Sequence, residues 1–507
     1  MKLTKLTTLI YFVCLTFYSQ TTEQLQHLDN YFEKTLTEWQ LPGMAIAIVN
    51  SDSIIFSKGY GYASIDKKTK VNGSTLFAVA SNTKAFTASA IAKLVEEGKL
   101  NWNDKVVDYL PYFKMYNDYV TNHFTITDLL CHRSGLKTFS GDLLWYGTTH
   151  SAEYIIEAQQ YLTPEYEFRT TFGYSNIAYL TAGKIIEKVS GKSWQKYIQQ
   201  HFLDPLQMNR TLTSTTQLKN YKNIATPYYL ENGINHELNW VNWDNIAPAG
   251  ALISSVDDFS KWLQYNLTEG KENSFQIISE NSFRKLTTPH INFEVGKNTE
   301  NIHFKSYALG WNVQDYQGIK VISHGGGYDG MISKSFFIPE KNVGVVILTN
   351  SINWVPSALT NKILDVLVTN NTSGLDWSAN YLGYKKHQDS LTTLKYQKNE
   401  VLRGKLQKNH LELQNYTGIY TDKIYGNVTV SIKNKSLYFK MDNTPIFHAN
   451  LTHWNHHIFT FRFPKHLASL PEGKLWFDIN KNGEISKLHI DVPNPDFDFT
   501  EFEFIKQ

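Results

Sequence analysis

The distribution of strand and helix signals along residues 25–370 limits the fold of this chain more than any other feature. Early in this segment, β-branched residues on both sides of a turn at 50–53 predict two strands within 42–66. Late in it, the runs YALGWNV, VISHGG, KSFFIP and VGVVILTN predict four more strands between residues 307 and 350. Helical periodicity occupies the residues between. We therefore expect an α/β domain over 25–370, in which one sheet joins the first and the last portions of the segment.

A helical period of apolar residues begins at Phe77. Phe86, Ala90 and Leu94 fall on one face of a helix over 77–97, and Gly98 supplies a stop after it. Shorter helices are expected over 127–130, 175–189, 193–200 and 256–267. These helices lie between the early and the late strands, so they are expected to cover the sheet.

The composition changes after residue 370. Residues 371–410 are polar and rich in lysine, and we interpret them as a helical linker. Residues 411–507 alternate apolar and polar side chains over short runs, and an Asn-Gly turn at 482–483 lies between two of these runs. A separate, small antiparallel β domain is therefore expected at the C-terminal end.

The N-terminal residues have the pattern of a secretory signal. Lys2 and Lys5 precede an apolar run over 6–18, which is too short to span a bilayer comfortably, and polar residues follow. We expect a signal peptide over 1–20 and export to the periplasm or the cell exterior, with an uncleaved anchor as the alternative. Removal of this segment would leave Cys131 as the one cysteine, which excludes an intramolecular disulfide.

Charge and histidine spacing exclude two classes of function. The 49 basic and 47 acidic residues give a formal net charge of +2, so the chain has no basic footprint for nucleic acid. The histidines of the run HWNHH, at 453, 456 and 457, have no acidic or cysteine partner in metal-ligating spacing. Neither a metal site nor a cofactor is predicted.

The first functional motif is the Ser-x-x-Lys of Ser81 and Lys84. At a helix start, the helix dipole and the free backbone N–H groups favour negative charge on Ser81. Lys84 lies one turn further along the same face, where its amine can take the serine proton. The pattern is weak alone, because it also occurs at four other serines. Serine is also a favoured helix N-cap, so a purely structural role is the alternative.

Two distant segments supplement this motif. Tyr174 and Asn176 stand at the entrance of a predicted amphipathic helix. His324 is followed by Gly325, Gly326 and Gly327 at the end of a predicted strand, where glycines permit a close approach of the backbone to a substrate. The alternative for this segment is a hairpin turn with a hydrogen-bonded histidine.

With these three motifs in this order, the chain resembles the serine β-lactamase-like hydrolases, which include class C β-lactamases, D-alanyl-D-alanine carboxypeptidases, D-aminopeptidases and related esterases. Connecting segments such as PGMAIAIV, ITDLLCHRSGL and AGALISSVDDFSKWL strengthen the resemblance, which covers residues 25–370. It implies an antiparallel sheet flanked by helices, with a helical subdomain. Residues 411–507 resemble the small lipocalin-like barrel often attached to such hydrolases.

The resemblance also implies roles for the motif residues. Ser81 would be the nucleophile that forms an acyl-enzyme, and Lys84 and Tyr174 would share the work of the general base. The substrate would be a small molecule or short peptide. The oxyanion hole would consist of the backbone N–H groups of Ser81 and Gly327. The residues expected to bind substrate are Asn176, His324, Gly326 and Gly327.

His324 departs from the family pattern, since penicillin-processing members mostly carry lysine there. A lysine is a fixed cation for a substrate carboxylate, whereas histidine is largely neutral at pH 7. This departure favours a peptidase or esterase. The alternatives are a penicillin-binding D,D-carboxypeptidase or weak β-lactamase, and a catalytically silent ligand-binding protein of the same fold.

Overall fold

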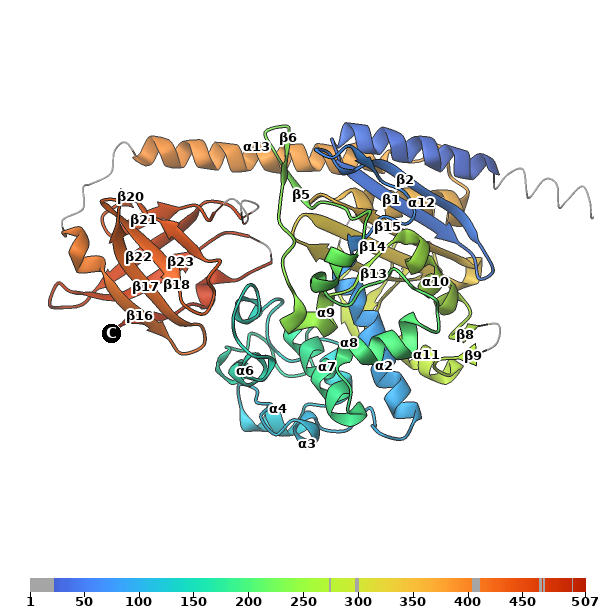
Figure 1. The fold of residues 1–507 in the computed structure, drawn as a ribbon, viewed down its shortest axis with the longest axis horizontal. Helices are drawn as coiled ribbons and strands as arrows, with labels where there is room; N and C mark the ends of the chain where they lie inside the picture. Colours follow the sequence, from blue (N-terminus) through green and yellow to red (C-terminus); the bar gives the residue numbers. More distant parts are fainter. Residues whose placement is uncertain are drawn as a thin grey trace, which may run out of the picture.

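The computed structural model describes residues 22–272, 275–296, 301–403, 411–464, 467, 470–494 and 496–507. The expected signal peptide over 1–20 lies outside these residues. Figure 1 shows a large α/β part, a long helix α13 (Trp377–Arg403) that leaves it, and a β-barrel at the C-terminal end. Within the described residues, no helix combines the length and the apolar character needed to cross a membrane.

The centre of the α/β part is an antiparallel sheet of nine strands. Its order is β10-β11-β12-β13-β14-β15-β1-β2-β3. The early strand β1 (Gly43–Val49) pairs with the late strand β15 (Val343–Thr349), with Ile46 opposite Ile347. The prediction that one sheet joins the first and last portions of the segment is therefore confirmed. The other strands are β2 (Ile54–Ser64), β3 (Thr69–Lys70), β10 (Ile291–Phe293), β11 (Lys305–Tyr307), β12 (Asn312–Tyr316), β13 (Ile319–Tyr328) and β14 (Met331–Ile338).

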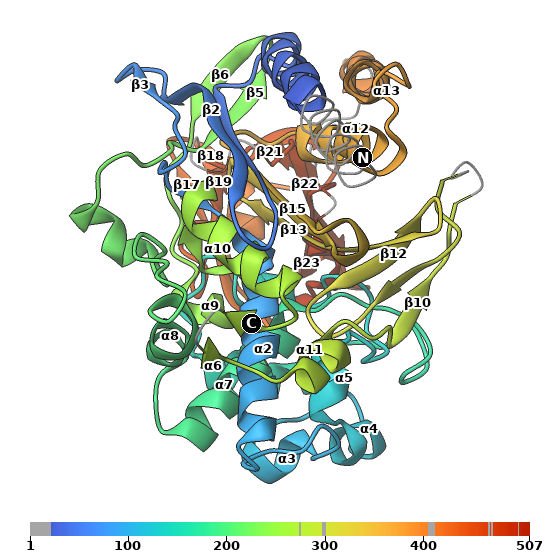
Figure 2. The ribbon, with the colours of Figure 1, turned by 90° about the vertical axis from the view of Figure 1, so that its right-hand side faces the viewer.

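Helices cover both faces of the sheet. Alternate residues of a strand point to opposite faces, and both sets of side chains in β1 are apolar, so both faces need a covering layer. Ile46 and Ile48 pack in one apolar cluster with the helix over 22–38 and α12 (Val355–Thr369). Ala45 and Ala47 belong to the larger cluster on the opposite face, with α2 (Thr83–Glu96) and α10 (Val256–Leu267). Figure 2 shows α2 running from the sheet into the helical subdomain.

The helical subdomain and its connections contain mostly short elements. The helices are α3 (Val106–Tyr109), α4 (Asp118–His123), α5 (Ile126–Leu130), α6 (Ala152–Ala158), α7 (Asn176–Ser190), α8 (Trp194–Ile198), α9 (Ala247–Gly250) and α11 (Glu280–Leu286). Two-stranded pairs are formed by β4 (Phe77–Ala78) with β7 (Ile253–Ser254), β5 (Tyr228–Glu231) with β6 (Ile234–Glu237), and β8 (Lys271–Glu272) with β9 (Phe275–Gln276). The helices predicted over 127–130, 175–189, 193–200 and 256–267 agree with α5, α7, α8 and α10.

The predicted helix over 77–97 begins later than expected. Phe77 and Ala78 form β4, because their backbone pairs with β7 and the N–H of Val79 donates to Leu252 O at 3.0 Å. A 3₁₀ turn over Ala80–Asn82 follows, and α2 starts at Thr83. Ala80 has a φ of +45°, which interrupts any right-handed helix. Ser81 therefore lies in a turn before the helix. The structural alternative, in which this serine is the helix N-cap, does not hold, because the N-cap residue of α2 is Asn82.

The C-terminal part is a nearly closed antiparallel barrel with the strand order β19-β18-β17-β16-β24-β23-β22-β21-β20. The Asn-Gly turn at 482–483 connects β22 to β23, and Gly483 takes the positive φ of +82° that such a turn needs. The strands are β16 (Gly418–Asp422), β17 (Gly426–Lys433), β18 (Ser436–Met441), β19 (His448–Asn450), β20 (Thr452–Asn455), β21 (Ile458–Phe461), β22 (Gly473–Ile479), β23 (Ile485–Asp491) and β24 (Phe504–Lys506). The α/β class with a C-terminal antiparallel β part is confirmed.

Candidate active site

Ser81 is half-buried in the turn between β4 and α2, and its neighbour Asn82 fixes this turn to the central sheet. Asn82 Nδ2 donates to Val79 O at 3.2 Å and to Ser333 Oγ at 2.8 Å. Asn82 Oδ1 accepts from Ser335 Oγ at 2.6 Å. Both serines lie on β14, so the turn that presents Ser81 cannot move independently of the sheet.

Lys84 lies in the first turn of α2, and its amine is completely buried. Lys84 Nζ donates to Ser81 Oγ at 3.1 Å, to Asn176 Oδ1 at 2.7 Å and to Ala249 O at 2.9 Å. Desolvation lowers the pKa of Lys84 to about 7, and the carboxylate of Asp142 acts in the opposite direction. A substantial fraction of this lysine is therefore uncharged near neutral pH and able to accept a proton.

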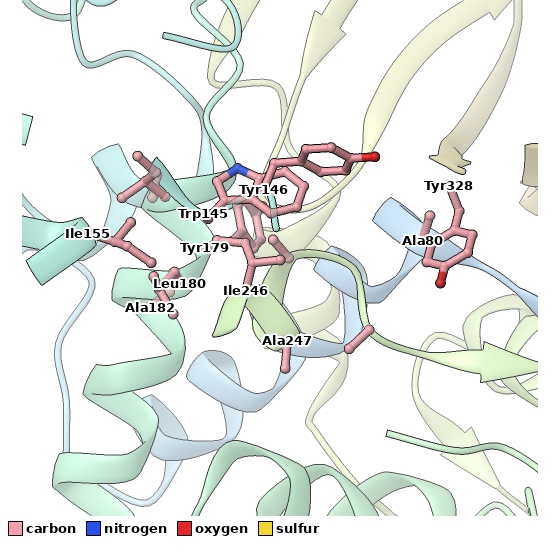
Figure 3. Packing of buried hydrophobic residues seen from close by; sticks show 14 of the residues in the cluster. Ala80, Trp145, Tyr146, Ile155, Tyr179, Leu180, Ala182, Ile246, Ala247 and Tyr328 are labelled. Atoms are coloured by element: carbon pink, nitrogen blue, oxygen red, sulfur yellow. The ribbon is translucent and has the colours of Figure 1, made fainter. Parts of the chain in front are cut away.

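Tyr179 of α7 lies beside the amine, with its ring centroid 5.4 Å from Lys84 Nζ, and belongs to the large apolar cluster. Figure 3 shows Tyr179 of α7, Ala247 of α9 and Tyr328 at the end of β13 in the same packed region as Ala80, which precedes the serine. Trp145 lies on the loop that precedes α6 and is 3% exposed. Buried side chains of this kind exclude water, and the resulting low dielectric constant strengthens the interactions between charges among them.

Tyr174 is the third motif residue that the structure brings to Ser81. Its ring centroid lies 4.7 Å from Lys84 Nζ, and the neighbouring side chain of Ser81 acts to lower the pKa of its hydroxyl. Burial is the largest effect on this hydroxyl and raises the pKa of Tyr174, so the free protein holds it protonated. The ring of His132 lies against it, with centroids 4.4 Å apart. The tyrosine is thus suited to donate a proton.

Asn176 connects this group to a carboxylate that sequence reasoning missed. Its Oδ1 accepts from Lys84, and its Nδ2 donates to Asp142 Oδ2 at 2.6 Å. Asp142 is 2% exposed, and burial raises its pKa to about 7. The one sequence signal was an acid directly followed by the apolar run LLWY, which predicts burial of a charged group but names no partner for it.

His324 lies on β13 and is 3% exposed. Its Nδ1 is 2.6 Å from Gly325 O, and its Nε2 is 2.9 Å from the hydroxyl of Tyr307. A carbonyl oxygen can only accept, so Nδ1 carries the hydrogen and Nε2 accepts from Tyr307. Burial lowers the pKa of His324 to about 3. The ring is therefore neutral at physiological pH, and both of its nitrogens already have partners inside the protein.

The glycines after His324 let β13 pass very close to the serine turn. A Cβ atom on Gly326 would lie 2.3 Å from Val79 O and 2.9 Å from Ser81 N, which no side chain could occupy. Gly327 follows on the same strand, opposite Ile332 of β14. The structure thus brings this segment to the Ser81 backbone, whereas the pairing of the Ser81 and Gly327 N–H groups in an oxyanion hole stays a prediction. In the described part of the chain, no three His, Cys, Asp or Glu side chains gather in a way that could hold a metal ion.

Comparisons with known proteins agree with this arrangement. Residues 28–370 match the family model described as Beta-lactamase, and residues 402–506 match a domain of unknown function, DUF3471. Protein flp of Staphylococcus aureus (strain MW2) is 30% identical over 384 residues, which are 74% of this chain and 72% of that protein. Unguisins hydrolase ungD of Aspergillus violaceofuscus is 29% identical over 397 residues, or 72% and 69% of the two chains.

Solved structures share the fold at low identity. The octameric penicillin-binding protein homologue from Pyrococcus abyssi has a TM-score of 0.62 at 22% identity, covering 95% of this chain and all of that one. A D-stereospecific amidohydrolase from Streptomyces sp. has a TM-score of 0.55 at 20% identity, covering 68% of this chain and 99% of that one.

Proposed function

The chain belongs to the β-lactamase family, and from this premise we propose that it is an exported serine hydrolase that cleaves an amide or ester through an acyl-enzyme at Ser81. One observation carries the proposal. Ser81 Oγ lies 3.1 Å from a buried amine whose pKa is lowered to about 7. A serine hydroxyl becomes a nucleophile when a neighbouring base takes its proton, and this lysine can do so at neutral pH.

In the first half of the proposed reaction, uncharged Lys84 takes the proton of Ser81 as Oγ attacks the substrate carbonyl. The backbone N–H groups of Ser81 and Gly327 would stabilise the oxyanion; loss of one such donor typically costs on the order of a hundredfold or more in rate. Tyr174 gives its hydroxyl proton to the leaving group and regains one from Lys84. In the second half, a water molecule gives a proton to the Lys84–Tyr174 pair and attacks the acyl carbon. The pair then returns this proton to Ser81 Oγ as the acyl group leaves.

The state of His324 supports a peptidase or esterase rather than an efficient β-lactamase. Its ring is neutral and its nitrogens bond Gly325 and Tyr307, so it supplies no fixed cation for a substrate carboxylate. The names of two similar proteins, an unguisins hydrolase and a D-stereospecific amidohydrolase, favour hydrolysis as well. The second candidate is a penicillin-binding carboxypeptidase or weak β-lactamase, which the name of the Pyrococcus homologue favours. A silent ligand-binding protein would not need the Ser81–Lys84 contact.

Two covalent probes separate these candidates. The purified protein and a Ser81→Ala variant would be treated with a labelled fluorophosphonate and with a labelled penicillin. Labelling by the fluorophosphonate alone supports the peptidase or esterase, and labelling by both supports a penicillin-binding enzyme. Absence of both labels would refute the proposal. Turnover of p-nitrophenyl esters, D-amino acid amides and nitrocefin would then define the substrate class.

A further inference from the structure

The C-terminal barrel packs against the loop that carries Asp142. This loop, residues 137–149, lies between α5 and α6 in the chain. At one end, Lys137 forms an ion pair with Asp498 of the barrel. At the other end, the N–H of Thr149 donates to Asn443 O at 2.8 Å. Between them, the ring of Tyr146 lies 4.5 Å from that of Phe497.

Glu501 of the barrel contacts the two residues that precede Asp142. Its Oε1 accepts from Ser140 Oγ at 2.6 Å, and its Oε2 accepts from the N–H of Gly141 at 3.0 Å. Tyr425, also in the barrel, donates its hydroxyl to the same Oε2 at 2.6 Å and fixes the carboxylate. Gly141 has a φ of +77°, and its N–H is held in this left-handed turn immediately before Asp142.

A series of hydrogen bonds, joined at one step by the Gly141–Asp142 peptide bond, therefore runs from the barrel to the serine. Glu501 holds Ser140 and Gly141, and the next residue, Asp142, accepts from Asn176. Asn176 in turn accepts from Lys84, which lies against Ser81. Displacement of Asp142 would leave Asn176 Nδ2 without its acceptor in a buried site and release the amide that orients the amine.

We propose that Glu501 is a positioning residue for the active site, so that the docked barrel holds Asp142 and, through it, Asn176 and Lys84 in their working geometry. This inference rests on the proposed serine hydrolase function. It assigns the barrel a part in turnover through one carboxylate, distinct from any ligand that the barrel itself holds.

The first test is Glu501→Gln in the full chain. Glutamine keeps the shape of the side chain but has one acceptor oxygen, whereas three donors converge on the two oxygens of Glu501. We expect kcat to fall by about tenfold or more, the size typical of a lost hydrogen bond to a charged group, with a smaller change in KM. Two controls should keep wild-type kcat. Glu503→Gln changes the same charge at an exposed position, and Tyr154→Phe removes a different contact with the barrel, the bond to Ile424 O.

A second variant keeps the test independent of barrel folding. Ser140→Ala lies on the hydrolase side and removes the bond to Oε1 while the charge of Glu501 remains. It should lower kcat in the same direction as Glu501→Gln. Wild-type kcat in both variants would overturn the inference.

A double-mutant cycle shows whether Glu501 acts through Asp142. In an Asp142→Ala background, Glu501→Gln should change kcat by no more than about twofold, because the path through Asp142 is already cut. A loss that multiplies with that of Asp142→Ala would overturn the inference, since it would mean that Glu501 acts by another route. Ser81-dependent labelling of the wild type separates this failure from a failure of the proposed function: without such labelling the hydrolase proposal itself is wrong.

Discussion

Replacement of Asp142 by asparagine should move the acid limb of the pH–rate profile to lower pH. In the proposed mechanism the base is uncharged Lys84, so kcat/KM should rise with pH through the pKa of this amine, about 7 in the free protein. The carboxylate of Asp142 favours the ammonium form, which raises that pKa against the lowering effect of burial. Asparagine keeps an oxygen that can accept from Asn176 Nδ2 but removes the charge, so the pKa of Lys84 should fall.

The magnitude follows from the two hydrogen bonds that separate the charges. Lys84 Nζ is 2.7 Å from Asn176 Oδ1, and Asn176 Nδ2 is 2.6 Å from Asp142 Oδ2. One amide group lies between them, so the charges are about 6–7 Å apart and, at an effective dielectric constant of about 20, interact by about 2.5 kcal/mol. That energy corresponds to nearly 2 pKa units for a fully ionised carboxylate. Burial raises the pKa of Asp142 to about 7, so it is partly protonated at neutral pH and the expected shift is roughly one unit or more.

The assay is kcat/KM for a neutral p-nitrophenyl ester between pH 5 and pH 9, in the wild type and in Asp142→Asn. Asp389→Asn, which removes one carboxylate from an exposed position on α13, is the control and should leave the profile unchanged. An acid limb that stays in place would refute the reasoning about the base. If instead charged Lys84 supported a Tyr174 phenolate, activity would need the ammonium, and the variant would lose activity from the alkaline side.

Three further predictions test other parts of the site. Ser81→Ala should abolish turnover and fluorophosphonate labelling while the melting temperature stays near that of the wild type; substantial turnover by the folded variant would remove the nucleophile assignment. His324→Lys should raise kcat/KM for nitrocefin relative to a neutral ester by roughly tenfold or more, since an ammonium near a carboxylate contributes about 1–4 kcal/mol. It should also lower the melting temperature, because the position is buried, and an unchanged substrate ratio would mean that residue 324 does not sense substrate charge. A chain that ends after Lys386 keeps the turns of α13 whose Trp377 and Ser378 bond to Asp365 and Trp39, so it should stay soluble and folded by circular dichroism. It lacks Glu501 and should turn over at least about tenfold more slowly, and full activity would contradict the role given to the barrel.

Local sequence patterns were enough to predict the architecture, because the strands of the sheet and the main helices follow local rules. Runs of β-branched residues bounded by turn residues made β1 and β15 recognisable as strands, although both are almost completely buried and show no alternation. The order of elements required that they share a sheet. The start of α2 could not be predicted in this way. Phe77 and Ala78 are apolar and fit a helical period, but their backbone pairs with β7, which lies more than 170 residues away in the sequence. Tertiary pairing overrode the local pattern.

The motifs predicted which residues would meet, and the structure brings Ser81, Lys84, Tyr174, Asn176, His324 and Gly326 into one region. The protonation state of each one depends on neighbours that no motif contains. His324 is held neutral by burial, and its tautomer is fixed by Gly325 O and the hydroxyl of Tyr307, which belongs to another strand. Asp142 carries no motif at all, and its partner Asn176 is 34 residues further along the chain. A single sequence contains these side chains but not the distances that make them interact.

The burial of Lys84 and its hydrogen-bonded connection to Asp142 through Asn176 together set the pKa of this amine. Burial alone would lower it far enough that the amine, although uncharged, would be a weaker base, and a fully ionised carboxylate alongside would keep it protonated. Asp142 stands one amide away, near enough to oppose the desolvation but not to form a direct ion pair. A value near 7 therefore depends on the distance from Asp142 to the amine, and that distance depends on the loop over 137–149. Because Glu501 holds this loop, undocking of the barrel should change the basicity of Lys84 as well as its orientation, although the barrel itself contributes no group to the reacting atoms.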